Sequence, residues 1–162
     1  MTAQAMPNNE PMTRDVTLTR LLDAPRELVW AAWTEPTRMA QWWGPHHFTN
    51  PLCEVDAQVG GRFLVHMKAP DDTVYPMTGT FIEVVKPERL RFKAFAEALD
   101  GTKYLESDTT VTFEQDGART RLTVKASARG LHPAAPQMLG GMEAGWSQSL
   151  ERLQALVMQG AK

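Results

Sequence analysis

The spacing of apolar residues changes twice along the chain and divides it into three parts. Near the start, alternating β-branched residues predict a strand from Val16 to Leu22. The next segment has helical spacing, and Pro25 suits a first helical turn. A second short helix is expected from Pro36 to Trp43, ended by Gly44. The first part therefore predicts one strand followed by two short helices.

Between Leu52 and Ser127, apolar and polar residues alternate, which is typical of strands with one buried face. Groups of turn-forming residues interrupt the alternation at hairpin-like intervals. These groups are Gly60-Gly61, Asp71-Asp72, Lys86-Pro87-Glu88, Asp100-Gly101 and Asp116-Gly117. Together with the first strand, the pattern predicts an antiparallel sheet of about seven strands.

Helical spacing returns after Pro133 and predicts one helix of roughly 24 residues, about 36 Å long. Its apolar stripe consists of Leu139, Met142, Trp146, Leu150, Leu153 and Val157. Only this helix is long enough to cover the sheet. We therefore expect an α+β helix-grip fold, in which a curved antiparallel sheet wraps around a long C-terminal helix. Residues 1–13 are expected to form a disordered tail, and 14–162 a single domain.

Three glycines in the first half of the predicted C-terminal helix need an explanation. Gly140, Gly141 and Gly145 each cost a helix about 1 kcal/mol relative to alanine. Either their backbone packs closely against the sheet, or they leave open space. In the second case the flexible Met138 helps to line a pocket beside Trp146. The sequence alone leaves both alternatives open.

Composition limits the classes of function. The 162 residues are 43% hydrophobic and carry a net charge of -2, as in an ordinary globular protein without a preference for nucleic acid or anionic membrane. No stretch of eighteen apolar residues and no apolar leader occurs, so a cytoplasmic protein is expected. One cysteine, Cys53, makes no internal disulfide and is expected to be a structural thiol.

The sequence predicts no catalytic set, metal site or cofactor. Gly145-Trp146-Ser147 resembles part of a nucleophile motif, but that motif needs a turn between strand and helix, and this segment is helical. No nucleotide-binding motif is present. The histidines lack the spacing of metal ligands; they are His46, His47, His66 and His132.

Some polar residues of the predicted strands could face either side of the sheet. Arg62 and His66 lie on the same face of their predicted strand, because they are an even number of residues apart. If that face points inward, they would orient a ligand head group; if it points outward, they would have no such role. Tyr104 and Glu106 would reach the interior if a bulge intervened. The favoured alternative places three acidic residues on the solvent face: Glu106, Asp108 and Glu114.

Five segments occur in an order that resembles a known family. They are TRLLDAPRELVWAAWTEPTRMAQWWGP, CEVDAQVGGRFLVHM, GTFIEVVKPERLRF, TRLTVKA and GGMEAGWSQSLERL. Together, over about residues 14–159, they resemble the bacterial homologues of the activator of heat shock protein 90 ATPase, within the START and Bet v 1-like (SRPBCC) superfamily. The resemblance implies the helix-grip fold and a cavity between the sheet and the long helix. Superfamily members use that cavity to carry lipids or hormones, to cyclise polyketides or to condense substrates.

The motif residues of that family look like turn, cap and packing positions rather than a catalytic set. They are Asp23, Ala24, Pro25, Trp33, Trp43, Gly44, Pro45, Gly60, Gly61, Gly145 and Trp146. The co-chaperone that gives the family its name has a further domain before this one, for which this chain has no room. Activation of a chaperone is therefore not the expected function.

The hypothesis drawn from the sequence is a protein that binds a small hydrophobic or aromatic ligand, without assigned catalysis, cofactor, metal, nucleic acid or membrane. The expected ligand-binding residues are Trp43, Phe63, Val65, Met67, Met77, Phe81, Phe92, Tyr104, Met138, Met142 and Trp146. One of Trp42 and Trp43 is expected to pack in the core, and the other could form part of a lid over the mouth of the cavity. The alternatives are a cofactor-free enzyme for an aromatic or polyketide-like substrate and a chaperone-interacting module, and a homodimer stays open.

Overall fold

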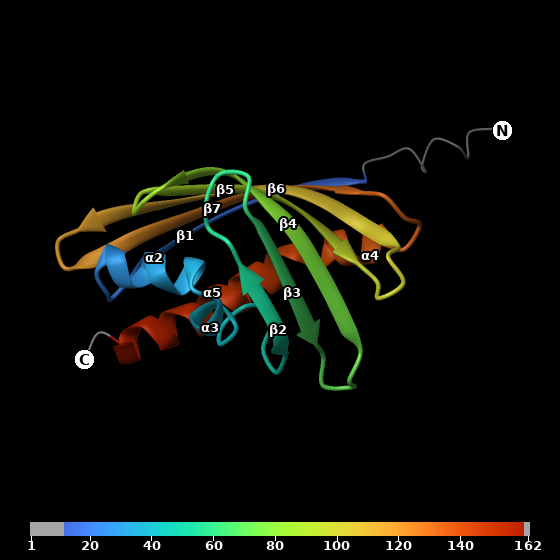
Figure 1. Ribbon diagram of the computed structural model, residues 1–162, viewed down its shortest axis with the longest axis horizontal. Coiled ribbons are helices and arrows are strands. Elements are labelled where there is room, and N and C mark those ends of the chain that lie inside the picture. The colour runs from blue at the N-terminus through green and yellow to red at the C-terminus, as the bar shows by residue number, and fades with distance from the viewer. Residues whose placement is uncertain (1–11, 161–162) are drawn as a thin grey trace.

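A single antiparallel sheet of seven strands forms one layer of the protein in a computed structural model that describes residues 12–160. The strands lie in the order β1-β7-β6-β5-β4-β3-β2, so each strand from β2 to β7 pairs with its neighbour in sequence and β1 lies beside β7. Figure 1 shows the sheet curving around α5, which runs beneath it. The strands are β1 (Thr13–Leu22), β2 (Thr49–Val55), β3 (Arg62–Lys68), β4 (Val74–Val85), β5 (Arg89–Glu97), β6 (Lys103–Asp116) and β7 (Arg119–Gly130).

The predicted helix-grip fold is confirmed, including the number of strands. β1 starts three residues before the predicted Val16. The predicted tail, residues 1–13, falls outside the described residues except for its last two positions.

Two short helices follow β1, as predicted: α2 (Arg26–Thr34) and α3 (Pro36–Met39). Pro25 is the residue before the first turn of α2 rather than part of it. The second helix ends four residues before the predicted Trp43. The Asn50 side-chain amide donates hydrogen bonds to the carbonyls of Ala40 and Trp43, at 2.9 and 2.8 Å, so the chain there is held as turns against β2.

The predicted C-terminal helix is interrupted. It consists of α4 (Ala135–Gly140) and α5 (Met142–Gly160), separated at Gly141, which has a φ of -93° and a ψ of 0°. Consecutive glycines favour a break because they have the lowest helix propensity after proline. The Arg14 guanidinium also donates to the carbonyls of Leu139 and Gly140 at 3.3 Å, which satisfies groups at the end of α4.

The space between α2, the second half of α5 and the sheet is filled by large side chains, and we call it the filled end. Trp33 lies at its centre, and its ring is 4.7 Å from that of Trp42 and 6.2 Å from that of Phe113, centroid to centroid. From α5, the filled end takes Leu150, Leu153 and Val157, all fully or almost fully buried. Close packing of this kind leaves no room for a ligand.

Candidate functional site

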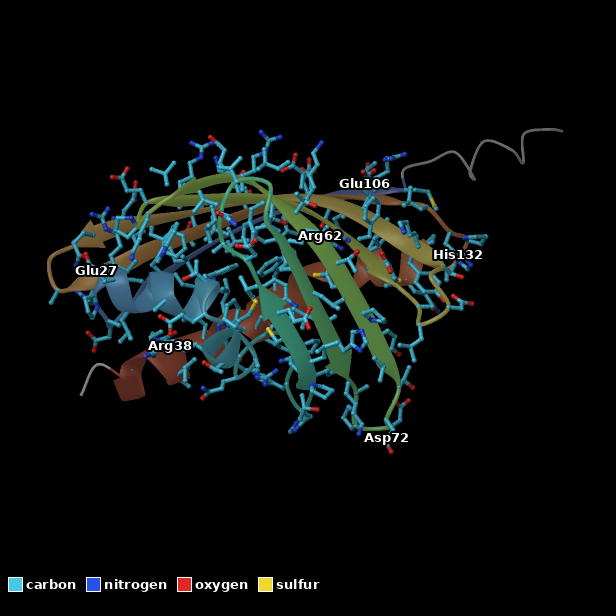
Figure 2. The ribbon with its side chains drawn as sticks, viewed as in Figure 1. Glu27, Arg38, Arg62, Asp72, Glu106 and His132 are labelled. Atoms are coloured by element: carbon cyan, nitrogen blue, oxygen red, sulfur yellow. The ribbon has the colours of Figure 1, made fainter. Side chains whose placement is uncertain are left out.

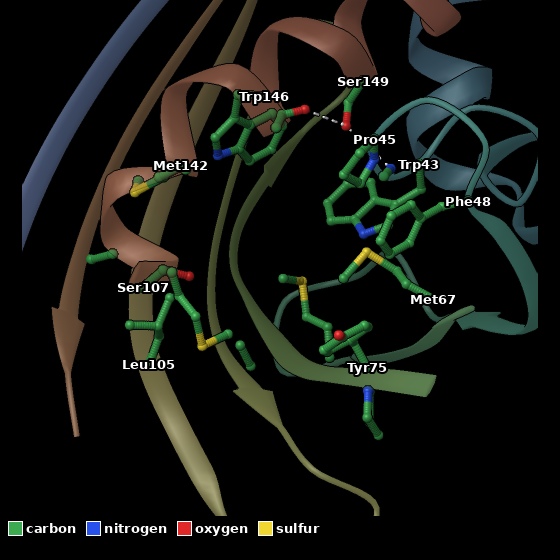
Figure 3. A pocket seen from close by; sticks show the side chains of 18 of the residues that line it. Trp43, Pro45, Phe48, Met67, Tyr75, Leu105, Ser107, Met142, Trp146 and Ser149 are labelled. Atoms are coloured by element: carbon green, nitrogen blue, oxygen red, sulfur yellow. Dashed lines mark hydrogen bonds between the residues drawn. The ribbon is translucent and has the colours of Figure 1, made fainter. Parts of the chain in front are cut away.

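A pocket of about 420 Å³ lies at the other end of the interior, which we call the hollow end. It is enclosed by β3 to β7, by α4 and the first half of α5, and by the loop between α3 and β2. Figure 3 shows Trp146 and Met142 on the helix facing Leu105 and Ser107 on the sheet, with Tyr75 and Met67 on another side. The pocket has the size and the largely apolar wall of a small-molecule site.

The glycines of the C-terminal helices border open space. A Cβ added to Gly145 would have no neighbouring heavy atom within 4 Å, and one added to Gly141 would approach only carbonyl oxygens of α4, at 3.8 and 3.9 Å. Both glycines line the pocket, whereas Gly140, also unobstructed, does not. Close packing against the sheet therefore does not explain these residues. Their lack of side chains leaves the volume of the pocket open.

The loop between α3 and β2 forms one wall of the pocket and is held by α5. Gly44 has a φ of 97°, which glycine adopts readily. Its N–H donates to the Ser149 hydroxyl at 3.1 Å. The Arg152 guanidinium donates to three successive carbonyls, those of Trp43, Gly44 and Pro45, at 2.9–3.2 Å. Partial burial lowers the pKa of Arg152 from its ordinary value. These bonds fix the ring of Trp43 against the pocket.

Seven of the predicted ligand-binding residues line the pocket. They come from the loop, three strands and both C-terminal helices: Trp43, Met67, Met77, Phe92, Met138, Met142 and Trp146. Trp43 is 5% exposed, so it forms part of the wall and not a lid. Trp42 is fully buried, and its indole N–H donates to the Ala32 carbonyl at 2.8 Å.

Four of the predicted residues do not line the pocket. Phe63, Val65 and Phe81 have the correct inward parity but lie deeper along their strands, in the packed core cluster. The Phe63 ring is 5.5 Å from that of Phe81 and 6.5 Å from that of Trp43. Tyr104 has the opposite parity to the pocket-lining Leu105, and its ring packs 4.7 Å from that of His132.

The sequence analysis missed three groups of lining residues. Parity would have found the first group, because Tyr75 shares a face with Met77, and Leu105 and Ser107 share one with Thr109. The second group gave no strong apolar signal, because its residues are small or polar or, in one case, a proline, which is unusual in a strand. They are Ala96, Glu97, Ala128, Gln137 and the buried Pro76. The third group consists of loop residues, for which no period exists, and of the polar Ser149 on α5 beside the loop: Gly44, Pro45, Phe48 and Ser149.

The acidic residues of β6 lie on the outer face of the sheet, as the favoured alternative stated. Glu106 forms an ion pair with Arg129, and Figure 2 shows it on the side away from α5. Asp108 accepts hydrogen bonds from the Arg91 guanidinium at 3.0 and 2.8 Å, which lower the pKa of its carboxyl. Arg62 and His66 alternate with the buried Phe63 and Val65, so they too face outward.

The remaining candidates for chemistry are occupied in structural roles. Ser147 lies inside α5 and accepts a hydrogen bond from Arg20 at 3.1 Å. Burial, with a smaller contribution from Glu54, raises the pKa of Cys53 to about 11, which keeps it a thiol. Residues 12–160 contain no group of three or more His, Cys, Asp or Glu side chains that could hold a metal ion.

Residues 23–158 match the model of one protein family, described as "Activator of Hsp90 ATPase homolog 1-like protein". The chain belongs to this family. The resemblance stated from the sequence is thereby confirmed, and the match covers most of the chain. Comparison with curated proteins gives no match.

Solved structures of bacterial proteins have the same fold. A protein from Chromobacterium violaceum is 29% identical, with a TM-score of 0.74 over 88% of this chain and 96% of its own. One from Nitrosomonas europaea is 27% identical, with a TM-score of 0.74 over 90% and 95%. The AHSA1 protein from Silicibacter pomeroyi, 23% identical, has a TM-score of 0.77 over 91% and 99%. Within the part of the chain that the structure describes, no helix is long and apolar enough to cross a membrane.

Proposed function

We propose that this protein binds a small, largely apolar organic molecule in the pocket between the sheet and the first half of α5. The family supports, in general, a ligand-binding or Hsp90-associated module. The observation that carries the ligand-binding alternative is that Gly145 borders the pocket with no atom near its missing side chain. If α5 only packed against the sheet, alanine at position 145 would stabilise the helix by about 1 kcal/mol.

The chemistry of the wall supports an apolar ligand. Trp43, Phe92 and Trp146 offer aromatic faces, and Met67 and Met142 offer flexible thioethers that adapt to different shapes. Each Å² of apolar ligand surface removed from water contributes about 25 cal/mol before the costs of association. We propose binding and assign no reaction; the Ser149 hydroxyl in the wall donates to the Gly145 carbonyl at 2.9 Å.

The test compares two glycine variants in fluorescence titrations with N-phenyl-1-naphthylamine, an uncharged apolar probe. Gly145→Leu places a side chain inside the pocket, whereas Gly140→Leu adds the same side chain to a neighbouring, equally unobstructed position outside it. We expect saturable 1:1 binding to the unmodified protein and to Gly140→Leu. The affinity of Gly145→Leu should be at least about tenfold lower, because the added side chain overlaps the probe.

Two results would overturn the proposal. One is the absence of saturable binding to the unmodified protein. The other is equal affinity in the two glycine variants, which would place the probe elsewhere on the protein. A pull-down of a bacterial Hsp90 by the unmodified protein, together with either result, would favour the chaperone-associated alternative.

A further inference from the structure

The pocket contains one polar strip, on β6. The register places Ser107 opposite Ala94 and Ala128, and Thr109 opposite Phe92 and Ala126, so both hydroxyl-bearing residues point to the concave face of the sheet. Both line the pocket. Two hydroxyl-bearing residues two positions apart on one strand lie side by side on that face.

These two side chains are shielded from solvent, since Thr109 is 1% exposed and Ser107 is half-buried. The Ser149 hydroxyl, also in the wall, donates to the Gly145 carbonyl and accepts from the Gly44 N–H. A polar group of a ligand that entered the pocket without a hydrogen-bond partner would cost about 1–3 kcal/mol, so the hydroxyls of Ser107 and Thr109 favour a ligand with a polar group beside them.

Among residues 12–160, Glu97 is the one acidic or basic residue that lines the pocket, and its charge is paired. The Glu97 carboxylate accepts a hydrogen bond from the Thr78 hydroxyl at 2.8 Å and lies 3.4 Å from the Lys103 ammonium. Thr78 on β4 is paired with Phe95 on β5, and each of the two residues alternates with inward-facing neighbours on its own strand. The Lys103 ammonium lies over the Phe95 ring. The charge of Glu97 is therefore paired with that of Lys103.

We infer that the ligand of this pocket is an uncharged molecule whose single hydroxyl or carbonyl group hydrogen-bonds to Ser107 and Thr109, its apolar body lying against Trp43 and Trp146. This inference rests on the proposed function. A ligand carbonyl accepts a hydrogen bond from either hydroxyl, and a ligand hydroxyl both donates and accepts. A charged ligand would lose its hydration without meeting an unpaired opposite charge. The chemical class is that of neutral phenols, alcohols and ketones.

The experiment is isothermal titration calorimetry at pH 7 with three probes that share one ring system: naphthalene, 2-naphthol and 2-naphthoate. The unmodified protein should bind 2-naphthol about fivefold more tightly than naphthalene, the ratio that one net hydrogen bond supplies. It should bind the 2-naphthoate anion at least about tenfold more weakly than naphthalene.

Variants locate the preference on β6. Ser107→Ala and Thr109→Val should each reduce the preference for 2-naphthol over naphthalene, and the double variant should bind the two probes with about equal affinity. Thr110→Val is the matched control, because Thr110 lies on the same strand with its side chain on the outer face. It should keep the full preference. Should Thr109→Val fail to fold, Ser107→Ala carries the same test.

The outcomes separate this inference from the proposed function. Equal affinity for naphthalene and 2-naphthol, with both lost in Gly145→Leu, would overturn the polar subsite and leave the binding pocket standing. A preference for 2-naphthol that survives in the double variant, or tighter binding of 2-naphthoate, would also overturn the subsite. Failure of naphthalene and of N-phenyl-1-naphthylamine to bind the unmodified protein would overturn both.

Discussion

The filled and hollow ends of the interior are built on the same sheet and the same helix, yet they differ in what α5 contributes. At the filled end the helix presents Leu150, Leu153 and Val157 to a cluster of aromatic rings. At the hollow end it presents Gly145 and the half-buried Met142. The difference indicates that stability is concentrated at one end, and that the other end gives up packing in favour of open volume.

The largest expected effect contrasts two large-to-small substitutions on α5. Leu153→Ala should lower the free energy of unfolding by about 3 kcal/mol, because it opens a cavity in a fully packed cluster. Met142→Ala should cost less than about 1.5 kcal/mol, because its side chain already borders open volume. Urea denaturation of both variants measures the difference. Equal losses would mean that the hollow end is packed as tightly as the filled end.

Glycine-to-alanine substitutions should change the free energy of unfolding in opposite directions in the sheet and in the helix. A Cβ at Gly79 would overlap the Phe63 ring and lie 2.8 Å from the Lys93 carbonyl oxygen, so Gly79→Ala should destabilise the protein by about 2 kcal/mol. Gly145→Ala should stabilise it by up to about 1 kcal/mol. Thermal and urea unfolding report both signs. A destabilising Gly145→Ala would show that the helix backbone needs to approach another group.

The loop wall should depend on Arg152. Arg152→Met removes the hydrogen bonds to the carbonyls of Trp43, Gly44 and Pro45, and should cost about 1–2 kcal/mol. Hydrogen exchange should then accelerate at residues 41–48, and the affinity for N-phenyl-1-naphthylamine should fall. Arg38→Met, which removes only an exposed ion pair with Glu35 at the start of the same short helix, α3, is the control and should leave exchange unchanged.

The smallest expected effect on stability comes from an ion pair on the outer face of the sheet, which extends over both ends. Because Arg91 lowers the pKa of Asp108 in the folded protein, their pair adds stability above about pH 4, and that contribution is lost as the pH falls through the folded-state pKa. Asp108→Asn should therefore lower the melting temperature slightly at pH 7, and this deficit should shrink as the pH falls below about 4, while probe affinity stays unchanged. A larger deficit at acid pH than at neutral pH would contradict this assignment.

Sequence patterns predicted the sheet well because each strand has one wet and one buried face, and period two reports that directly. Turn signals such as Asp116-Gly117 separated the strands correctly. The break at Gly141 was missed because the apolar stripe continues through it from Leu139 to Met142. Local spacing does not reveal that Arg14, more than a hundred residues away, binds the last carbonyls of α4.

The candidate site was predictable in part. Parity separates inward from outward residues, so Met67, Met77 and Phe92 were placed correctly. Parity does not report the position of a residue along the strand axis, and for that reason Phe63 and Phe81 were assigned to the pocket although they lie in the core cluster and do not line it. The loop residues Pro45 and Phe48 have no period at all, and hydrogen bonds to α5 position the loop that carries them.

The most direct test of ligand binding at the hollow end is a two-dimensional NMR titration with 2-naphthol that follows the indole N–H signals. The chain has five tryptophans, of which Trp43 and Trp146 line the pocket, while Trp30 and Trp42 lie in the core cluster. The account predicts large, saturable shifts for Trp43 and Trp146 and small ones for Trp30 and Trp42. Unchanged signals for Trp43 and Trp146, or equal shifts for all four, would contradict it.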